Sequence, residues 1–337
     1  RLHRDLVRVL TREQGFEALL RVRASAGLEV EMYRGSFMVR TEQDVDLPAV
    51  DADKSLVAYI KHKDRLKEGE EVAFQCALLY TTSRGGQRRI RVHTLSLPVT
   101  SVMGNVFRGA DLEAQMHSIV RGVVLGADRK MLEDPKRVKG AVTDACVSVL
   151  YAYRKYCATS SSTGQLILPE ALKLMPLATL GFCKRWTATG MQHPSEWQTL
   201  AAQLAATGIE GLGREVVPRL VNLATREVVT CSADAMEDEA VLLLLEGDVG
   251  YLWLGTTSFQ AQEQLFGHAD AQRIQALVAG GWTPPGVAGV NRTYFVARGS
   301  VAETKLMGKL TEDRTQSGMS YVEFLCHIHR QIQNRFL

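Results

Sequence analysis

The chain has 337 residues, and its 40 Lys and Arg against 37 Asp and Glu give a formal net charge of +3. Hydrophobic residues make up 46% and charged residues 23%, the balance of an ordinary globular protein with room for roughly two to three domains. The near-neutral charge excludes a polybasic tail and a globally basic nucleic-acid-binding protein. The longest apolar run, 240–245, is far shorter than the about 20 residues that a membrane helix needs.

Six cysteines are scattered along the chain, and no two of them form a C-x-x-C pair. Several lie in apolar periodic segments, so we expect reduced core thiols and no disulfide. The sequence opens at Arg1 with neither a methionine nor a charged-then-apolar leader. We therefore expect a fragment of a longer protein without a secretory signal.

The first hundred residues carry a strand pattern after a short helical start. Residues 5–10 are predicted to end a helix, and apolar and polar residues alternate between 16 and 97. A long strand at 72–80 is followed by the turn sequence SRGG at 83–86 and by a return strand at 90–94. Several short strands joined by turns predict an antiparallel sandwich or barrel.

After Asp111 the apolar period changes to about 3.6 residues, which is the period of a helix. Apolar stripes predict helices over 112–123 and 138–157, and Pro169 and Pro194 mark the starts of two more. This part of the chain is predicted to be a helical domain.

The pattern is mixed from about residue 231 onward. Strands are predicted at 241–246, 251–254 and 293–297, and short helices at 260–266 and 271–278. The last helix is predicted to begin at Ser320, because Ser320 and Glu323 have the spacing of a capping box. Its predicted buried stripe comprises Val322, Leu325, Ile328, Ile332 and Phe336.

No motif of a serine-hydrolase elbow, zinc protease, phosphate-binding loop or dinucleotide-binding fold is present. Cys326, His327 and His329 form the most metal-like group, but adjacent helical positions point about 100° apart and no further ligands are marked. We interpret them as residues of a packed helix and predict neither a metal nor a catalytic residue. The segment 164–169 is interpreted as a plain loop before a helix rather than as an anion site.

A pair of arginines lies on the first predicted strand. Arg21 and Arg23 are two residues apart, so both project from one face while Leu20 and Val22 project from the other. Planar guanidinium groups suit carboxylates, because each donates two parallel hydrogen bonds.

A second basic group, Arg89, Arg91 and His93, has the same spacing on the return strand of the hairpin. Two interpretations of these basic residues are open. They form a solvated sheet face with cross-strand ion pairs, or they bind an acidic peptide or an anionic lipid.

Long blocks of the sequence resemble the cargo-adaptor subunit of the COPII vesicle coat, the Sec24 family. They are 15–23 (GFEALLRVR), 76–82 (CALLYTT), 87–94 (QRRIRVHT), 153–158 (YRKYCA), 164–170 (GQLILPE), 172–176 (LKLMP) and 320–327 (SYVEFLCH). In addition, the LLEG and LWLG sequences within 244–255 resemble the gelsolin-like domain of that family.

The resemblance implies an α+β multidomain fold with an antiparallel β-sandwich, an all-helical domain and a gelsolin-like α/β domain. The expected domains are 1–14 (end of a trunk domain), 15–108 (sandwich), 109–230 (helical), 231–316 (gelsolin-like) and 317–337 (a helix packed on the helical domain). The family's zinc module and the rest of its trunk precede the sandwich and are not in this sequence. Zinc is therefore expected only in that upstream module, and one strand of the sandwich is expected to come from upstream as well.

The resemblance further implies a non-enzymatic adaptor at the cytoplasmic face of the endoplasmic reticulum and on COPII vesicles, without nucleic-acid binding. Implied partners are cytosolic tails of membrane cargo and SNARE proteins, an anionic membrane surface and, through the missing trunk, the GTPase-activating subunit of the Sec23 family. Acidic cargo signals are expected to bind at Arg21 and Arg23 first, and at Arg89, Arg91 and His93 second. The alternatives are the paralogous GTPase-activating subunit and a gelsolin-like actin-binding module.

Overall fold

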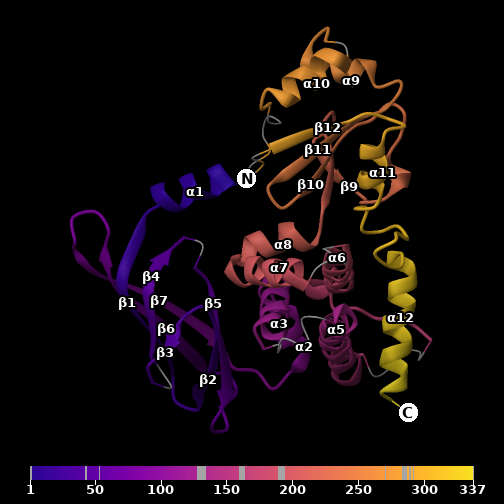
Figure 1. Cartoon of the computed structure of the whole chain (residues 1–337). Coiled ribbons are helices and arrows are strands. Elements are labelled where there is room, and N and C mark those ends of the chain that lie inside the picture. The colour runs from indigo at the N-terminus through magenta and orange to yellow at the C-terminus, as the bar shows by residue number, and fades with distance from the viewer. Residues whose placement is uncertain are drawn as a thin grey trace. The chain divides into compact units, whose positions relative to one another are not determined.

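Strands and helices alternate in blocks along the chain, as the sequence predicts (Figure 1). The computed structural model describes residues 2–41, 44–52, 54–126, 134–158, 164–188, 194–269, 271–282, 287, 290 and 292–336. These residues divide into two units, each described by itself. The first contains the described residues up to 110 with 118–126 and 201–208, and the second contains the others.

The first unit begins with a short helix and seven strands. Their bounds are α1 Leu2–Thr11, β1 Gln14–Ala24, β2 Leu28–Gly35, β3 Met38–Val39, β4 Asp44–Asp51, β5 Leu56–His62, β6 Glu71–Thr82 and β7 Arg88–Pro98, followed by helix α2 Met103–Arg108. One sheet has the order β3-β4-β1-β6-β7, and the other consists of β2 and β5. Every pairing is antiparallel, which confirms the predicted sandwich.

The two sheets enclose a core to which the alternating apolar residues of β1 contribute. Ala18 and Leu20 are buried with Val45 and Leu47 of β4, and Tyr33 of β2 packs against them. The burial of every second residue is what fixes the register of β1, since a slip by one residue would put the arginines into the core.

Arg121 connects the sandwich to two helices within the first unit. Its side chain is 1% exposed, and its guanidinium donates hydrogen bonds to the Ser55 carbonyl oxygen (2.6 Å), to the Ser55 hydroxyl and to the Ala205 carbonyl oxygen. Beside it, the Tyr59 hydroxyl donates to the Ser118 carbonyl oxygen at 3.0 Å. These bonds engage both terminal nitrogens of a buried cation that would otherwise be costly to desolvate.

Eight helices and five short strands make up most of the remaining described elements. The helices are α3 Leu112–Gly126, α5 Pro135–Cys157, α6 Met175–Ala188, α7 Pro194–Ala206, α8 Ile209–Val216, α9 Phe259–Phe266, α10 Ala271–Ala279 and α11 Val301–Met307. The strands are β8 Arg219–Asn222, β9 Glu227–Val229, β10 Val241–Glu246, β11 Val249–Leu254 and β12 Arg292–Val296. The helix predicted from Pro169 begins later, because residues 170–172 form only a single 3-10 turn.

The five strands of the second unit form a mixed sheet with the order β12-β11-β10-β8-β9. Only β11 and β12 are parallel among these pairings. The predicted boundary at 231 divides this sheet, because β8 and β9 precede it and pair with β10 and with each other. These two strands are short, so their period-two pattern is weak in the sequence.

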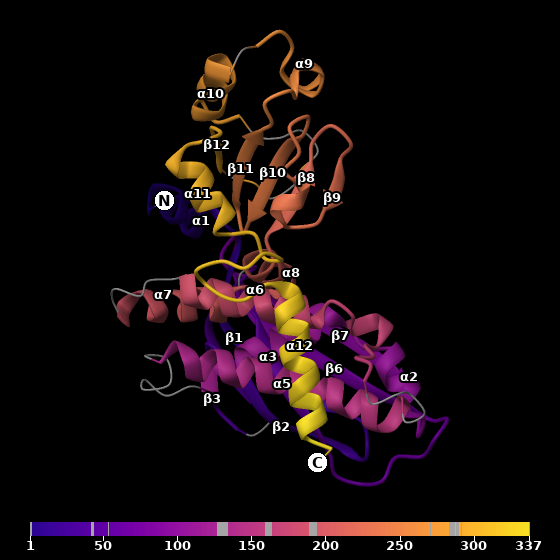
Figure 2. The same ribbon diagram turned by 90° about the vertical axis from the view of Figure 1, so that its right-hand side faces the viewer.

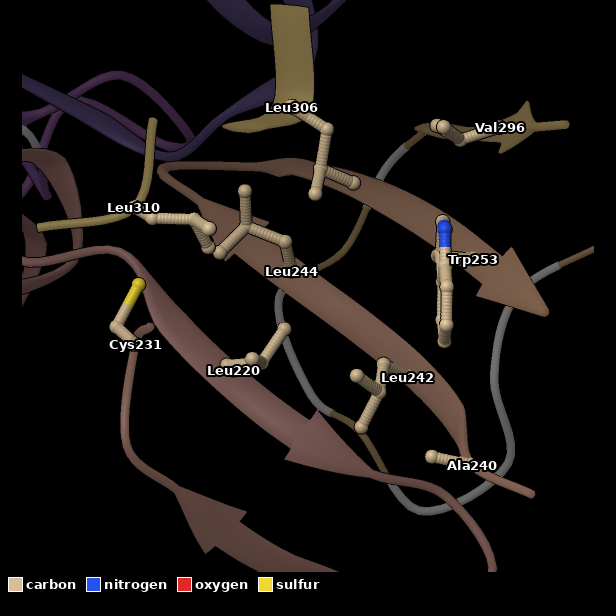
Figure 3. Close-up of a cluster of buried hydrophobic side chains, with 9 residues drawn as sticks. All are labelled: Leu220, Cys231, Ala240, Leu242, Leu244, Trp253, Val296, Leu306 and Leu310. Atoms are coloured by element: carbon tan, nitrogen blue, oxygen red, sulfur yellow. The ribbon is translucent and has the colours of Figure 1, made fainter. Parts of the chain in front are cut away.

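Helices cover both faces of the mixed sheet. On one face Leu220, Leu242, Leu244 and Trp253 pack with Leu306 of α11 (Figure 3). On the other face apolar residues of β8, β10 and β11 pack against Ile274 and Val278 of α10. None of the described helices has both the length and the apolar character that a bilayer crossing demands.

The last helix, α12 Tyr321–Asn334, packs against α5 and α6 (Figure 2). Ser320 and Glu323 form the predicted capping box: the Glu323 amide donates to the Ser320 hydroxyl at 3.3 Å, and the Ser320 amide donates to the Glu323 carboxylate at 2.8 Å.

The buried stripe of α12 differs from the predicted one. Phe324, Ile328 and Ile332 are buried, whereas Val322 is 70% exposed and Phe336 is 49% exposed. Residues four apart share a helix face, but Val322 lies about 120° around the helix from Ile328.

The ammonium group of Lys184 on α6 holds the segment that leads to α12. It donates to the carbonyl oxygens of Leu310 (3.3 Å), Thr311 (2.8 Å) and Asp313. Lys184 is 6% exposed, and this burial lowers the pKa of its amine while the charge of Asp313 opposes the shift. A charged group at this depth requires such partners.

Replacing Ile328 by Ala should lower the free energy of unfolding by about 2–5 kcal/mol, because it leaves a cavity between α12 and the helices beneath it. Replacing Val322 by Ala on the same helix is the matched control and should change the stability by less than about 0.5 kcal/mol. Chemical denaturation followed by circular dichroism measures both. Equal losses for the two variants would contradict the observed orientation of α12.

Candidate functional site

The arginine pair lies in the middle of the five-stranded sheet. Strand β1 runs between β4 and β6, and the register places Asp44 of β4 opposite Arg21 and Gln75 of β6 opposite Arg23. Both arginines project from the face opposite to the buried Leu20, as the alternation predicts. We call this side of the sheet the outer face.

Arg21 is engaged in an ion pair with Asp44. Its Nε donates to Oδ1 of Asp44 and its Nη2 donates to Oδ2, so the two side chains meet as a bidentate pair. This hydrogen bonding raises the pKa of Arg21 and lowers the pKa of the Asp44 carboxyl. The pair is what the solvated-face interpretation predicts. Arg23 is exposed and has no ion pair with any residue that the structure describes.

Apolar side chains lie across the outer face from Arg21, whereas Arg23 faces the polar Gln75 and Thr94. Ala77 of β6 lies beside Arg21 and is itself paired with Val92 of β7. Two residues further along β7 on the same face lies Ile90. Ile90 is 64% exposed and Val92 is 50% exposed. The outer face therefore offers an accessible cationic group next to an accessible apolar surface.

The second basic group lies on the opposite side of the same sheet. Arg89, Arg91 and His93 pair with Tyr80, Leu78 and Cys76, which belong to the core-facing side of β6. The Nε of Arg91 donates to the Tyr80 hydroxyl at 3.0 Å, and this bond raises the pKa of Arg91. The sheet thus separates this group from Arg21 and Arg23, so the five predicted residues do not form one site.

Strand β7 is the edge of the sheet and is exposed at every position. Leu95 and Leu97, on the core-facing side, are 55% and 44% exposed. An edge strand with free backbone groups and uncovered apolar side chains is a surface to which a further strand can be added.

The described residues contain no cluster of three or more His, Cys, Asp or Glu side chains that could hold a metal ion. The ring of His327 stacks on that of Phe324 at a centroid distance of 6.3 Å. All six cysteines are free thiols; burial raises the pKa of Cys146 to about 12 and that of Cys183 to about 11, so these two thiols stay protonated.

The sequence prediction missed the partner of Arg21. Asp44 and Asp46 alternate with Val45 and Leu47, which is the pattern of a strand with one acidic face. That alternation could have identified an acidic strand, but only the pairing of β4 with β1 places Asp44 opposite Arg21.

Comparison with known proteins finds two matching family models. The Sec23/Sec24 beta-sandwich domain matches residues 15–100, and the Sec23/Sec24 helical domain matches residues 111–203. The chain is 36% identical to the protein transport protein SEC24 B of Arabidopsis thaliana over 99% of its own length and 33% of that protein. It is 31% identical to human Sec24C over 98% of its length and 32% of that protein.

Among solved structures, the human COPII-coat protein Sec24c is similar along the entire chain. The TM-score is 0.82 at 26% sequence identity, and the match covers 100% of this chain and 47% of that one. The chain spans about a third of the length of the curated relatives that it matches.

We expect the Asp44 carboxyl to titrate below the ordinary value of about 3.9, because Arg21 hydrogen-bonds its charged form. The ion pair then stabilises the fold above the unfolded-state pKa, and this contribution is lost as the pH falls through the folded-state pKa. NMR titration of the carboxyl carbons should show the Asp44 midpoint moving upward in Arg21→Ala. The midpoint of Asp238, which Arg298 lowers, should stay in place. An unmoved Asp44 midpoint would mean that Arg21 does not hold this carboxylate.

Proposed function

The chain belongs to the Sec24 family, and on that premise we propose that it is part of a COPII-coat cargo adaptor that recruits membrane cargo without enzymatic activity. The family models, the transport names of the relatives and the likeness to a COPII-coat structure support this role. The curated relatives compared above are named Sec24, which favours the adaptor over the paralogous GTPase-activating subunit.

The observation that carries the proposal for the site is the outer face, where the exposed Arg23 lies next to Arg21 on β1. Across the sheet from Arg21 lies the apolar Val92, and Ile90 is the next outer-face residue along β7. A cargo signal with an acidic residue next to an apolar one would place its carboxylate on a guanidinium and its apolar side chain on β7. Arg23 is free to bind such a carboxylate. Arg21 is shared with Asp44, so the incoming carboxylate competes with this residue for Arg21.

Arg89, Arg91 and His93 form a second, separate candidate surface on the other side of the sheet. Its position on the exposed edge strand β7 supports binding of an extended segment there. We propose that in the longer protein a strand from upstream of this sequence pairs with β7. Such a strand would cover Leu95 and Leu97.

We propose the remaining partners from family membership. They are cytosolic tails of membrane cargo and of SNARE proteins, an anionic membrane surface and a Sec23-family subunit that contacts the upstream trunk. The protein would act at the cytoplasmic face of the endoplasmic reticulum and on COPII vesicles. Weak sites of this kind gain strength when a coat links many copies, because a second binding event then occurs at high local concentration. Zinc is proposed only for the upstream module.

The double variant Arg21→Ala, Arg23→Ala should bind acidic cargo-signal peptides about tenfold or more weakly, because the charge-assisted hydrogen bonds are lost. Asp44→Asn should bind them more tightly, because it removes the internal competitor for Arg21. The double variant Arg65→Ala, Arg84→Ala, at exposed positions elsewhere in the same unit, is the matched control. Fluorescence anisotropy at low and high salt measures all four proteins. If wild type and the Arg21, Arg23 variant are both folded and bind with equal affinity, these two arginines are ordinary surface charges without a role in peptide binding.

Two direct assays separate the adaptor from its rivals. The chain should not accelerate GTP hydrolysis by the small coat GTPase, and it should not cosediment with filamentous actin. Stimulated hydrolysis would favour the paralogous GTPase-activating subunit. Cosedimentation would favour an actin-binding role for the α/β part.

A further inference from the structure

Three arginines line one cavity in the second unit. The cavity has a volume of about 630 Å³, within the range of ligand-binding pockets. Its basic lining consists of Arg214 at the end of α8, Arg219 on β8 and Arg226 in the turn between β8 and β9. Among the described residues of the lining, Glu113 at the start of α3 is the only acidic one, so positive charge prevails there.

The cavity occupies a part of the sheet face that α10 leaves uncovered. On that face Leu243 is buried in the cluster that contains Ile274 and Val278 of α10. Val221 and Leu245 are only half-buried and line the cavity together with the buried Leu223. Val228 of the edge strand β9 also lines it and is 66% exposed. The floor is thus an apolar extension of the hydrophobic core, and Figure 2 shows β8 and β9 at the rim of the sheet.

Two acidic residues adjacent in the chain to lining residues are engaged elsewhere: Glu215 follows Arg214, and Glu246 lies between Leu245 and Gly247. Glu215 pairs with Arg185 at 3.5 Å, and Glu246 pairs with Lys309 at 2.6 Å. Within the described chain, no ion pair or side-chain hydrogen bond engages the guanidinium groups of Arg214, Arg219 and Arg226. The three groups therefore present their donors to whatever enters the cavity.

The backbone conformation of Arg226 does not explain why an arginine is found at this position. Its φ is +62°, in the left-handed region that glycine and asparagine adopt most readily. The turn itself is held by the Asn222 side chain, which accepts from the Ala224 amide at 3.0 Å. The backbone amide of Arg226 closes the turn by donating to the Asn222 carbonyl oxygen at 2.8 Å, and its side chain adds a cation to the cavity wall.

From this arrangement we propose that the cavity binds an extended peptide in which carboxylates flank an aliphatic side chain. The carboxylates would bind Arg219 and Arg226, and the aliphatic side chain would contact Val221 and Val228. The short edge strand β9 offers backbone groups to a peptide of this shape. The site is distinct from the outer face of the sandwich and does not depend on the function proposed for Arg21 and Arg23.

An array of octapeptides with a fixed central Glu-Leu-Glu and varied flanking residues tests this assignment. The full chain with Arg21→Ala and Arg23→Ala serves as the parent, so that the sandwich contributes no binding through these residues. Members that bind should lose affinity by at least about tenfold in the added double variant Arg219→Gln, Arg226→Gln. Both positions are exposed, so the melting temperature should remain that of the parent.

The added double variant Arg137→Gln, Arg330→Gln removes the same charge from exposed positions of the second unit and should bind as the parent does. Arrays with Gln-Leu-Gln and Glu-Ala-Glu centres should both bind more weakly than the Glu-Leu-Glu array. The proposal is overturned if no member binds above its Gln-Leu-Gln counterpart, or if Arg219→Gln, Arg226→Gln binds as the parent does. It is equally overturned if that variant impairs binding only to phosphatidylserine vesicles or inorganic phosphate.

Discussion

In the second unit, the buried ammonium group of Lys184 fixes the segment 310–313, which leads from the mixed sheet back to the helices. Three carbonyl oxygens from the segment 310–313 surround it, and together they offset the cost of removing a cation from water. Because Lys184 belongs to α6, this contact fixes the returning chain on the helical part just before Ser320 begins the last helix. The direction in which α12 then crosses α5 and α6 follows from that anchor and from the row of Phe324, Ile328 and Ile332.

In the sandwich, strand register determines on which face of the sheet each basic side chain lies. The burial of Ala18 and Leu20 fixes the arginines of β1 on the outer face, and the pairing of β6 with β7 fixes Arg91 on the other. One sheet thus separates two basic groups that look equivalent in the sequence. Their surroundings differ as well, since Arg21 is held by a carboxylate and Arg91 by the Tyr80 hydroxyl.

The sequence was informative wherever a pattern is local. Period-two alternation predicted that Arg21 and Arg23 share a face, and the spacing of Ser320 and Glu323 predicted the cap of α12. Contacts between distant segments could not be predicted this way: Asp44 meets Arg21 only through the pairing of two strands. The arginine cavity was missed for the same reason, because Arg214, Arg219 and Arg226 come from a helix, a four-residue strand and a turn.

The mixed sheet is inserted into the helical part, since α8 precedes it, α12 follows it, and both contact α6. This arrangement has a consequence for synthesis on the ribosome. The helices made first cannot complete their packing until the sheet segment and then α12 have left the exit tunnel. Until that moment the faces of α5 and α6 that receive Ile328 and Ile332 are open to water and to other chains. Helix α12 therefore completes a part of the molecule whose first helices were made some two hundred codons earlier.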